Sequence, residues 1–320
     1  DGLDDEKETV REEAVRSLGR ILNERDVKDI KPFFVAFTKA LEDEDYYVRR
    51  EAASRLADIR LPFPEGVQKG LMGALERVDD WAMQDIVWAL SRVDDKGVAD
   101  QMLIIIEDSN YGVDMSFEMA VASMDASLVE SRLVELAGSE DAMTRANASM
   151  ALAYLGSEKA QEVLVGQLSS DVAFTRQLAA SGLGVCGDAD AAPALEKLLS
   201  DPDEDVVMEA LASLGEVGRR NAGSVDVDAL MAKLEDPNPR VKSDAATALG
   251  YLGDRAAAPK LLELFTQDVI KLKSMGCGFC CGVVAQYGYA LTLLGDDDET
   301  YAALLKLVKN QHPRTRGEAA

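Results

Sequence analysis

The residues most suggestive of chemistry are three cysteines in the segment GCGFCCG, residues 276–282. Cys277 and Cys280 form a Cys-x-x-Cys motif, and Cys281 adjoins it. A complete zinc or iron–sulfur site usually needs four ligands, and the other thiol, Cys186, lies about three repeats away. The small residues of the segment favour close helix packing, with cysteine acting as a small apolar side chain. We therefore expect no metal site, and a metal or redox role of the three cysteines is the alternative.

Side-chain combinations for catalysis are sparse. His312 is the only histidine, so sites that need two or more imidazoles are excluded. No Ser/His/Asp or Cys/His set can be assembled, and no glycine-rich phosphate loop follows a strand. The sequence therefore predicts a protein that is not an enzyme and that holds no cofactor.

A stripe of aromatic and charged side chains is the best candidate for binding. Trp81, Asp85, Trp88 and Arg92 are spaced i, i+4, i+7 and i+11, which places them on one helical face, offset from the apolar face of the same helix. Trp, Tyr and Met are enriched at the dominant positions of protein interfaces. With their counterparts in neighbouring units, the predicted partner-binding residues form an exposed aromatic and acidic patch: Trp81, Asp85, Trp88, Tyr47, Glu51, Glu118 and Met119. The alternative is that the tryptophans fill gaps in an irregular unit.

These residues belong to a repeat that runs through the whole chain. VREEAVRSLG at 10–19, VRREAASRLA at 48–57, VVMEALASLG at 206–215 and VKSDAATALG at 241–250 share small or apolar residues at i, i+4 and i+5 and Leu at i+8. This spacing indicates one face of an α-helix. The last residue of the frame, here called the closing position, recurs nine times at intervals of 28 to 42 residues: Leu18, Leu56, Leu90, Met124, Leu152, Leu183, Leu214, Leu249 and Leu291.

Each frame is preceded by another helical segment and a short acidic turn, such as APALEKLLSD at 192–201 and DPDED at 201–205. Asp caps the helix that follows, and Pro ends the helix before it. Leu-Gly follows the frame, as at 155–156 and 252–253, where Gly can take the left-handed conformation that ends a helix. The unit is therefore helix, turn, helix and glycine stop, without a convincing strand. Such a pair buries both apolar faces only by stacking on its neighbours.

The predicted fold is all-α, a right-handed α-solenoid of about nine helix pairs. It is a single array over residues 1–320, with an insertion near 266–282 and a last repeat that stops short at 300–320. The first ten residues lack the parts of a signal peptide, so a cytoplasmic location is expected. Residues 274–295 are 22 residues without a charge, but their second half keeps the repeat frame, so a buried repeat is predicted rather than membrane insertion.

The pattern of an acidic turn, Val-Arg, paired alanines and Leu-Gly resembles HEAT repeats, in particular the HEAT-like class named after the phycobilisome (bilin) lyases. The best copies are DPDEDVVMEALASLGEVG at 201–218 and DPNPRVKSDAATALGYLG at 236–253, and the resemblance extends from about Glu6 to Arg316. It implies a solenoid. HEAT-like enzymes include a hydroxylase with repeated His-Glu pairs, which the single histidine excludes, and DNA glycosylases with a basic groove, which the charge argues against. A bilin-lyase-like enzyme or cofactor chaperone stays open.

The chain is strongly acidic, with 34 Lys and Arg against 58 Asp and Glu and a net charge of −24. Nucleic acids and anionic lipids are bound by clustered basic residues, so this charge argues against both as partners. The acidity fits adaptation to high salt, where repulsion is screened, or capture of a basic partner, and both interpretations stay open.

The expected function is a non-catalytic scaffold or adaptor that binds a partner protein or peptide on the concave face of the solenoid, with membership of a larger complex left open. One alternative is the bilin-lyase-like role. Another is a subunit of a redox assembly that uses the Cys277, Cys280 and Cys281 segment.

Overall fold

The computed structural model describes residues 2–24, 29–59, 65–75, 80–93, 95–108, 115–275, 280–294 and 302 of the chain. Over these residues the chain consists of α-helices and four short 3₁₀ helices, and no strand is present. The 3₁₀ helices are Gly2–Asp4, Ala189–Ala191, Leu198–Ser200 and Arg255–Ala257. The all-α prediction is therefore confirmed for the described part of the chain.

The α-helices alternate between two roles, as the repeat predicts. The second helices of the pairs carry the repeat frame: α1 (Glu8–Glu24), α3 (Tyr46–Asp58), α5 (Asp80–Leu90), α7 (Met115–Ala122), α9 (Ala142–Leu155), α11 (Ala173–Cys186), α13 (Glu204–Arg220), α15 (Pro239–Leu252) and α17 (Cys280–Leu294). The first helices precede them: α2 (Lys31–Leu41), α4 (Glu65–Leu75), α6 (Lys96–Glu107), α8 (Ala126–Leu136), α10 (Glu158–Gln167), α12 (Ala192–Lys197), α14 (Val227–Lys233) and α16 (Ala258–Met275). The described residues thus hold eight complete pairs, and α1 adds a second helix without its first.

The closing positions form the centre of the core. From Leu56 to Leu291, each closing residue has at most 6% of its surface exposed. Leu18 is the exception and is half-buried. Its helix, α1, is the first of the described second helices and packs against α3, so among the described elements Leu18 is covered by a second helix on one side.

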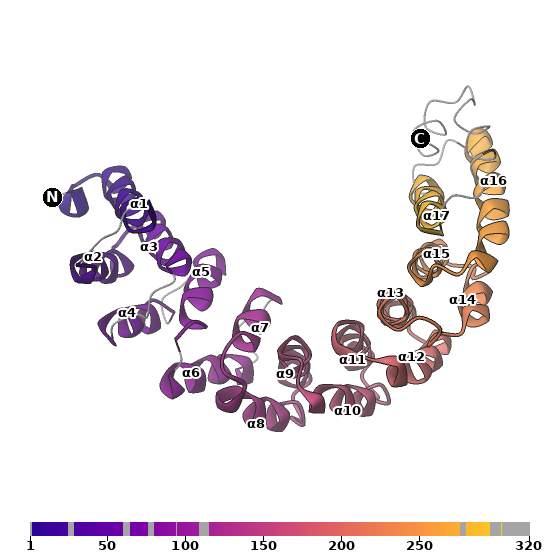
Figure 1. Cartoon of the computed structure of the whole chain (residues 1–320), viewed down its shortest axis with the longest axis horizontal. Coiled ribbons are helices and arrows are strands. Elements are labelled where there is room, and N and C mark those ends of the chain that lie inside the picture. The colour runs from indigo at the N-terminus through magenta and orange to yellow at the C-terminus, as the bar shows by residue number, and fades with distance from the viewer. Residues whose placement is uncertain are drawn as a thin grey trace. The chain divides into compact units, whose positions relative to one another are not determined.

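The chain divides into two compact units, Asp1–Leu155 and Gly156–Ala320. In the first unit, α1, α3, α5, α7 and α9 contact one another in chain order, while α2 packs on α4 and α6 on α8. In the second unit, α11, α13, α15 and α17 stack in the same way, each against its own first helix. Each unit therefore has two layers, one of first helices and one of second helices (Figure 1). Stacking in chain order within each unit is the solenoid arrangement, while its right hand and the single array over residues 1–320 stay predictions.

Acidic turns start the helices, as predicted. The carboxylate of Asp45 accepts hydrogen bonds from the backbone N–H groups of Tyr47 and Val48, at 2.9 and 3.3 Å. Asp95 and Asp203 cap α6 and α13 in the same way. These bonds satisfy backbone donors that have no partner within the helix, and they hold the first turn of each helix in place.

Glycine stops the helices at two of the predicted Leu-Gly sites. Gly156 follows α9 with φ of 67°, and Gly253 follows α15 with φ of 69°. Both values lie in the left-handed region, where a side chain would be strained, so the backbone can leave the helix there at no steric cost.

Small residues next to the closing position let the second helices approach closely. Gly215 lies one residue after a closing position and faces Ala248, one residue before the next. A Cβ atom built on Gly215 would lie 3.0 Å from the Cα of Ala248. Gly250 stands against Ala290 in the same register, where the corresponding distance is 2.9 Å. The repeat thus fixes the register between stacked helices as well as the buried face.

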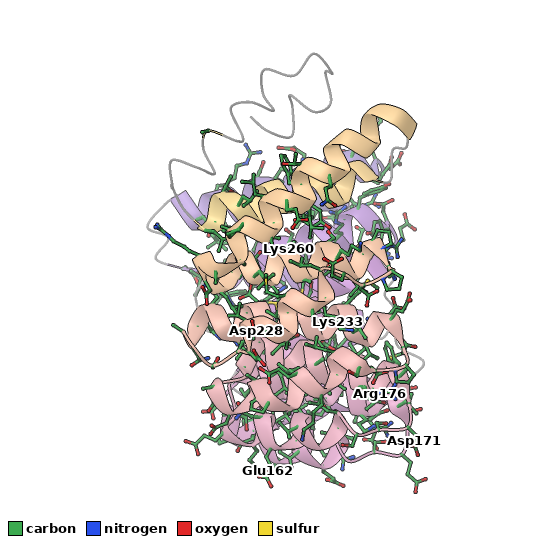
Figure 2. The ribbon with its side chains drawn as sticks, turned by 90° about the vertical axis from the view of Figure 1, so that its right-hand side faces the viewer. Glu162, Asp171, Arg176, Asp228, Lys233 and Lys260 are labelled. Carbon is green, nitrogen blue, oxygen red and sulfur yellow. The ribbon has the colours of Figure 1, made fainter. Side chains whose placement is uncertain are left out.

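Arginines tie successive turns together. Arg176 of α11 makes two hydrogen bonds of 2.7 Å to the carboxylate of Asp201, in the turn of the next pair. It also donates to the carbonyl of Ser170 in its own turn, where Figure 2 shows it close to Asp171. Arg11 bonds Asp43 in the equivalent way, at 2.8 and 2.9 Å. A bidentate ion pair between arginine and a carboxylate has a defined geometry, so it fixes the spacing of neighbouring turns.

The start of the predicted insertion near 266–282 is helical. α16 has 18 residues and continues through Met275, so the extra residues before position 276 lengthen a helix. Residues 276–279 lie outside the described part of the chain. In α17, Tyr287, Ala290 and Leu291 are buried, and the helix packs on α15. The prediction that the uncharged segment 274–295 ends in a buried repeat is confirmed for these residues.

Candidate functional site

The predicted binding patch lies on α3, α5 and α7, three consecutive second helices of the first unit. Tyr47 is in the first turn of α3, held there by the Asp45 cap, and 59% of its surface is exposed. Its ring stacks edge-on against Tyr46, with ring centres 5.2 Å apart. An aromatic side chain that is exposed and partly immobilised can contact a partner at a small entropic cost.

Glu51, one turn further along α3, is engaged within the chain. Its carboxylate accepts hydrogen bonds from Nε and Nη of Arg16 on α1, at 3.1 and 3.2 Å, and forms an ion pair with Arg55 at 3.1 Å. The hydrogen bonds that Arg16 donates to Glu51, followed by those to Glu12 and Glu13, raise the pKa of Arg16. Glu51 therefore links α1 to α3 and offers a partner little unused hydrogen-bonding capacity.

Asp85 on α5 is half-buried. Burial is the main cause of the raised pKa of Asp85; the charge of Arg50 opposes this shift, and Asp58 adds to it. A carboxylate that is incompletely solvated gains from a cationic partner that would replace the lost water. Trp88, on the same helical face, is also half-buried, and its carbonyl accepts a 3.0 Å hydrogen bond from Ser91 Oγ.

Two predicted residues of α7 have different environments. Met119 is 39% exposed, as expected for the patch. Glu118 is only 7% exposed, so its placement in an exposed patch is corrected. It lies close to α9, where its charge, after the larger effect of burial, raises the pKa of Tyr154. The helical period alone placed Glu118 near the exposed face, whereas the neighbouring helix covers it.

The remaining predicted residues fall where the structure gives no side-chain description. Trp81 belongs to α5 and Cys280 and Cys281 begin α17, but their side chains lie outside the described residues, as do Cys277 and His312 altogether. Within the described ranges, no three His, Cys, Asp or Glu side chains gather as a metal site would require. Cys186 is half-buried at the end of α11, and burial raises the pKa of its thiol.

Exposed apolar residues outside the predicted patch stand at the start of α7, α9 and α11. Met115 is 61% exposed, and Met143 and Phe174 are each 41% exposed. Each stands nine residues before its closing position, as Tyr47 does in α3. Aligning the repeats on the closing position would have found them, because the signal is a shared repeat position and not a local motif.

The chain contains HEAT repeats. The family model for HEAT repeats matches residues 129–215, 173–227 and 198–272, which together make up somewhat less than half of the chain. The finer resemblance to the bilin-lyase class stays a prediction, because the matching model describes HEAT repeats in general. No curated protein sequence matches the chain. Among the described residues, no helix is both long enough and apolar enough to cross a bilayer.

Solved structures with the same fold include Kap95p and the karyopherin Kap121p. Kap95p, in a complex with RanGDP, is 15% identical with a TM-score of 0.60, over 94% of this chain and 46% of Kap95p. Kap121p bound to Nup53p is 12% identical with a TM-score of 0.57, and Kap121p bound to the extreme C-terminus of the phosphatase Cdc14p is 12% identical with a TM-score of 0.56. Both of these matches cover 99% of this chain and 44% of Kap121p. The chain spans less than half the length of these proteins, and the similarity shows the fold.

Proposed function

Because this chain is a HEAT-repeat protein, we propose that it is a non-catalytic scaffold that binds a partner protein or peptide on its second-helix layer. The observation that carries the proposal is the exposure of Tyr47 and Met119 on helices of one stacked layer, on either side of the half-buried Asp85. Tyrosine is enriched among the few residues that provide most of the binding energy in protein interfaces, and methionine is enriched in interfaces generally.

The construction of the layer supports this role. The second helices are stacked through buried closing residues and close small-residue contacts, so the surface is formed before any partner arrives. A preformed surface loses little conformational entropy on binding, which leaves more of the contact energy as affinity. In the solenoid that the sequence predicts, the second helices line the concave face. We therefore propose that the partner binds on that face.

The structural neighbours agree with a protein partner. Kap95p and Kap121p hold RanGDP, Nup53p and the end of Cdc14p on the same fold, although at 12–15% identity they indicate only that such a solenoid can hold proteins. The net charge of −24 argues against nucleic acid, whose phosphates require clustered basic residues. We therefore propose a cytoplasmic adaptor whose partner is a protein.

Affinity isolation tests the proposal. The full chain, immobilised at one end, is exposed to an extract of its own cells, and retained proteins are identified and then tested as purified components by calorimetry. We expect a saturable complex with at least one purified protein, and at least tenfold weaker binding after Tyr47→Ala together with Met119→Ala.

A matched control uses exposed apolar residues of the first-helix layer in the same unit. Val35 of α2 is 71% exposed and Ile104 of α6 is 52% exposed. Val35→Ala with Ile104→Ala removes exposed apolar surface from the other layer and is expected to leave the affinity unchanged. Equal weakening by both pairs would contradict a binding surface on the second helices. If none of the purified proteins binds the unmodified chain, the scaffold role itself is contradicted.

A further inference from the structure

Four of the five second helices in the first unit carry a large apolar or aromatic residue at their start; α1 has Thr9 there. The residues nine positions before the closing position are Tyr47 in α3, Trp81 in α5, Met115 in α7 and Met143 in α9. The three whose side chains are described are exposed by 59%, 61% and 41%. Single exposed apolar residues are common on protein surfaces, but a large apolar residue at the same repeat position in four successive second helices, exposed in the three whose side chains are described, is not expected by chance.

The stacking of these helices turns the repeat position into a row. α3 contacts α5, α5 contacts α7 and α7 contacts α9, so equivalent residues follow one another across the layer (Figure 1). α3 and α5 are also joined at their C-terminal ends, where Arg92, two residues after α5, donates to the carbonyls of Ala57 and Ile59 at the end of α3. Packed helices are about 8–10 Å apart, so the row repeats at about that distance. Tyr47, Trp81, Met115 and Met143 are called the apolar row below.

The turns beside this row are acidic. Asp43, Glu44 and Asp45 precede Tyr47, and Glu140 and Asp141 precede Met143. The side chain of Glu44 is 89% exposed, and Glu140 and Asp141 are exposed. A hydrogen bond from the backbone N–H of Thr144 is the main cause of the lowered pKa of Asp141, which keeps this carboxylate charged.

Arg11 pairs with Asp43 and lies 3.7 Å from Glu44, so part of the charge of the first turn is neutralised. The arginines that follow the two turns donate instead to backbone carbonyls. Arg49 donates to the carbonyls of Asp43 and Glu44, and Arg145 to those of Ser139 and Glu140. The first unit as a whole has 33 acidic against 18 basic residues. The apolar row is therefore bordered by a field of negative charge, which attracts a partner of the opposite sign.

We propose that the apolar row binds an extended, basic peptide segment with an apolar residue at every third position. The spacing of apolar residues in the peptide follows from the spacing of the helices. An extended polyproline-type chain rises about 3.1 Å per residue with three residues per turn, so every third side chain returns to the same side after about 9 Å. That distance matches the spacing of packed helices. Lysine or arginine at the intervening positions faces the acidic turns.

This inference rests on the proposed scaffold function and specifies the class of partner. Two features separate it from an ordinary apolar contact. The spacing of the apolar residues in the ligand matters as well as their number, and the sign of the ligand's charge matters as well as its presence. Both can be varied in a short synthetic peptide while the protein is kept whole.

The test is a fluorescence anisotropy titration of the full chain against a labelled peptide of four Leu-Lys-Pro repeats. We expect saturable binding that weakens at least tenfold when Tyr47, Met115 and Met143 are all replaced by Ser. The control variant, Val35→Ser with Ile104→Ser, is expected to bind the peptide as the unmodified chain does. Circular dichroism of each variant establishes that the helices are intact.

Two further peptides test spacing and charge. A peptide of the same composition with its four leucines adjacent, and a peptide of four Leu-Glu-Pro repeats, are each expected to bind at least tenfold more weakly. The inference is overturned if the first peptide does not bind, if the row variant binds it as well as the unmodified chain does, or if neither spacing nor charge alters the affinity.

The same variants distinguish this inference from the scaffold proposal. If a purified partner binds the row variant and the unmodified chain equally, the scaffold function stands and the apolar row is not its binding surface. If no purified protein binds the unmodified chain, the scaffold proposal fails, whatever the peptide titration shows.

Discussion

At the scale of single residues, some charged groups in this protein stabilise the folded state and others destabilise it. Arg176 and Asp201 form a bidentate pair whose side chains are 12% and 6% exposed. Asp244 on α15 is instead half-buried near another carboxylate, Glu209, on α13. The two cases predict opposite effects of removing a charge.

The Arg176–Asp201 pair is expected to stabilise the second unit. Arg176→Ala leaves the carboxylate of Asp201 buried without its cationic partner and should lower the free energy of unfolding by about 3 kcal/mol. Urea denaturation followed by circular dichroism measures this. Arg219→Ala is the control, because Arg219 pairs with Glu216 at the exposed surface, and such pairs contribute little. A loss of stability as large in the control as in Arg176→Ala would contradict the role of burial.

Asp244 is expected to destabilise the protein at neutral pH. Burial, with a smaller contribution from the charge of Glu209, raises the pKa of Asp244 to about 6. A folded-state pKa above the unfolded value means that the folded state binds the proton more tightly, so stability falls as pH rises from about 4 to about 6.

Asp244→Asn removes this cost. The free energy of unfolding should rise by about 1 kcal/mol at pH 7.5, after allowing for solvent screening, and the gain should vanish near pH 4. Denaturation at both pH values measures the difference. Glu209→Gln should in turn lower the pKa of Asp244, which NMR titration of its carboxyl group can follow. A gain from Asp244→Asn that is the same at both pH values would refute this account.

At the scale of elements, the second helices are positioned by contacts between small residues. Gly250 of α15 faces the backbone of Ala290 of α17, and a Cβ atom there would lie 2.9 Å from the Cα of Ala290. Gly166 of α10 has no atom within 4 Å of its own hypothetical Cβ. Both glycines lie within helices, so comparing their substitution by alanine separates the effect of packing from that of helix propensity.

Gly250→Ala is expected to destabilise the second unit by about 1 to 3 kcal/mol, because α15 and α17 must move apart. Gly166→Ala should be neutral or stabilising by up to about 1 kcal/mol, because alanine is the better helix former and no contact opposes it. Denaturant midpoints of the two variants decide this. Equal shifts in the same direction would mean that packing between α15 and α17 does not require glycine.

At the scale of the whole molecule, the chain is an acidic repeat protein in two compact units. Repeats contact only their neighbours along the chain, so stability is approximately a sum of local terms. Both tryptophans, Trp81 and Trp88, belong to the first unit, so their fluorescence reports on that unit alone, while circular dichroism at 222 nm reports on all helices.

Gly250→Ala is therefore expected to affect the two signals differently. The midpoint of urea unfolding by circular dichroism should fall, while the midpoint by tryptophan fluorescence should stay within error of that of the unmodified chain, since the substitution is in the second unit. Coincident shifts of both midpoints would show that the two units unfold as one.

The repeat pattern determined much of this protein without any structure. The closing residues from Leu56 to Leu291 are buried as predicted, acidic turns cap the helices, and Gly156 and Gly253 end them. These features are local or periodic, because a helix turns every 3.6 residues and a cap acts on the next three residues. A single sequence therefore contains the information for the helices and for the face that each one buries.

The tertiary structure decided which of the predicted site residues face a partner. Glu118 is buried near α9, and Glu51 is paired with Arg16, although both belong to the same predicted patch as the exposed Tyr47 and Met119. The exposure of a helical residue depends on the neighbouring helix, which comes from a segment some thirty residues away in the chain. Helical periodicity contains no information about that neighbour, so only the stacked helices show which side chains remain at the surface.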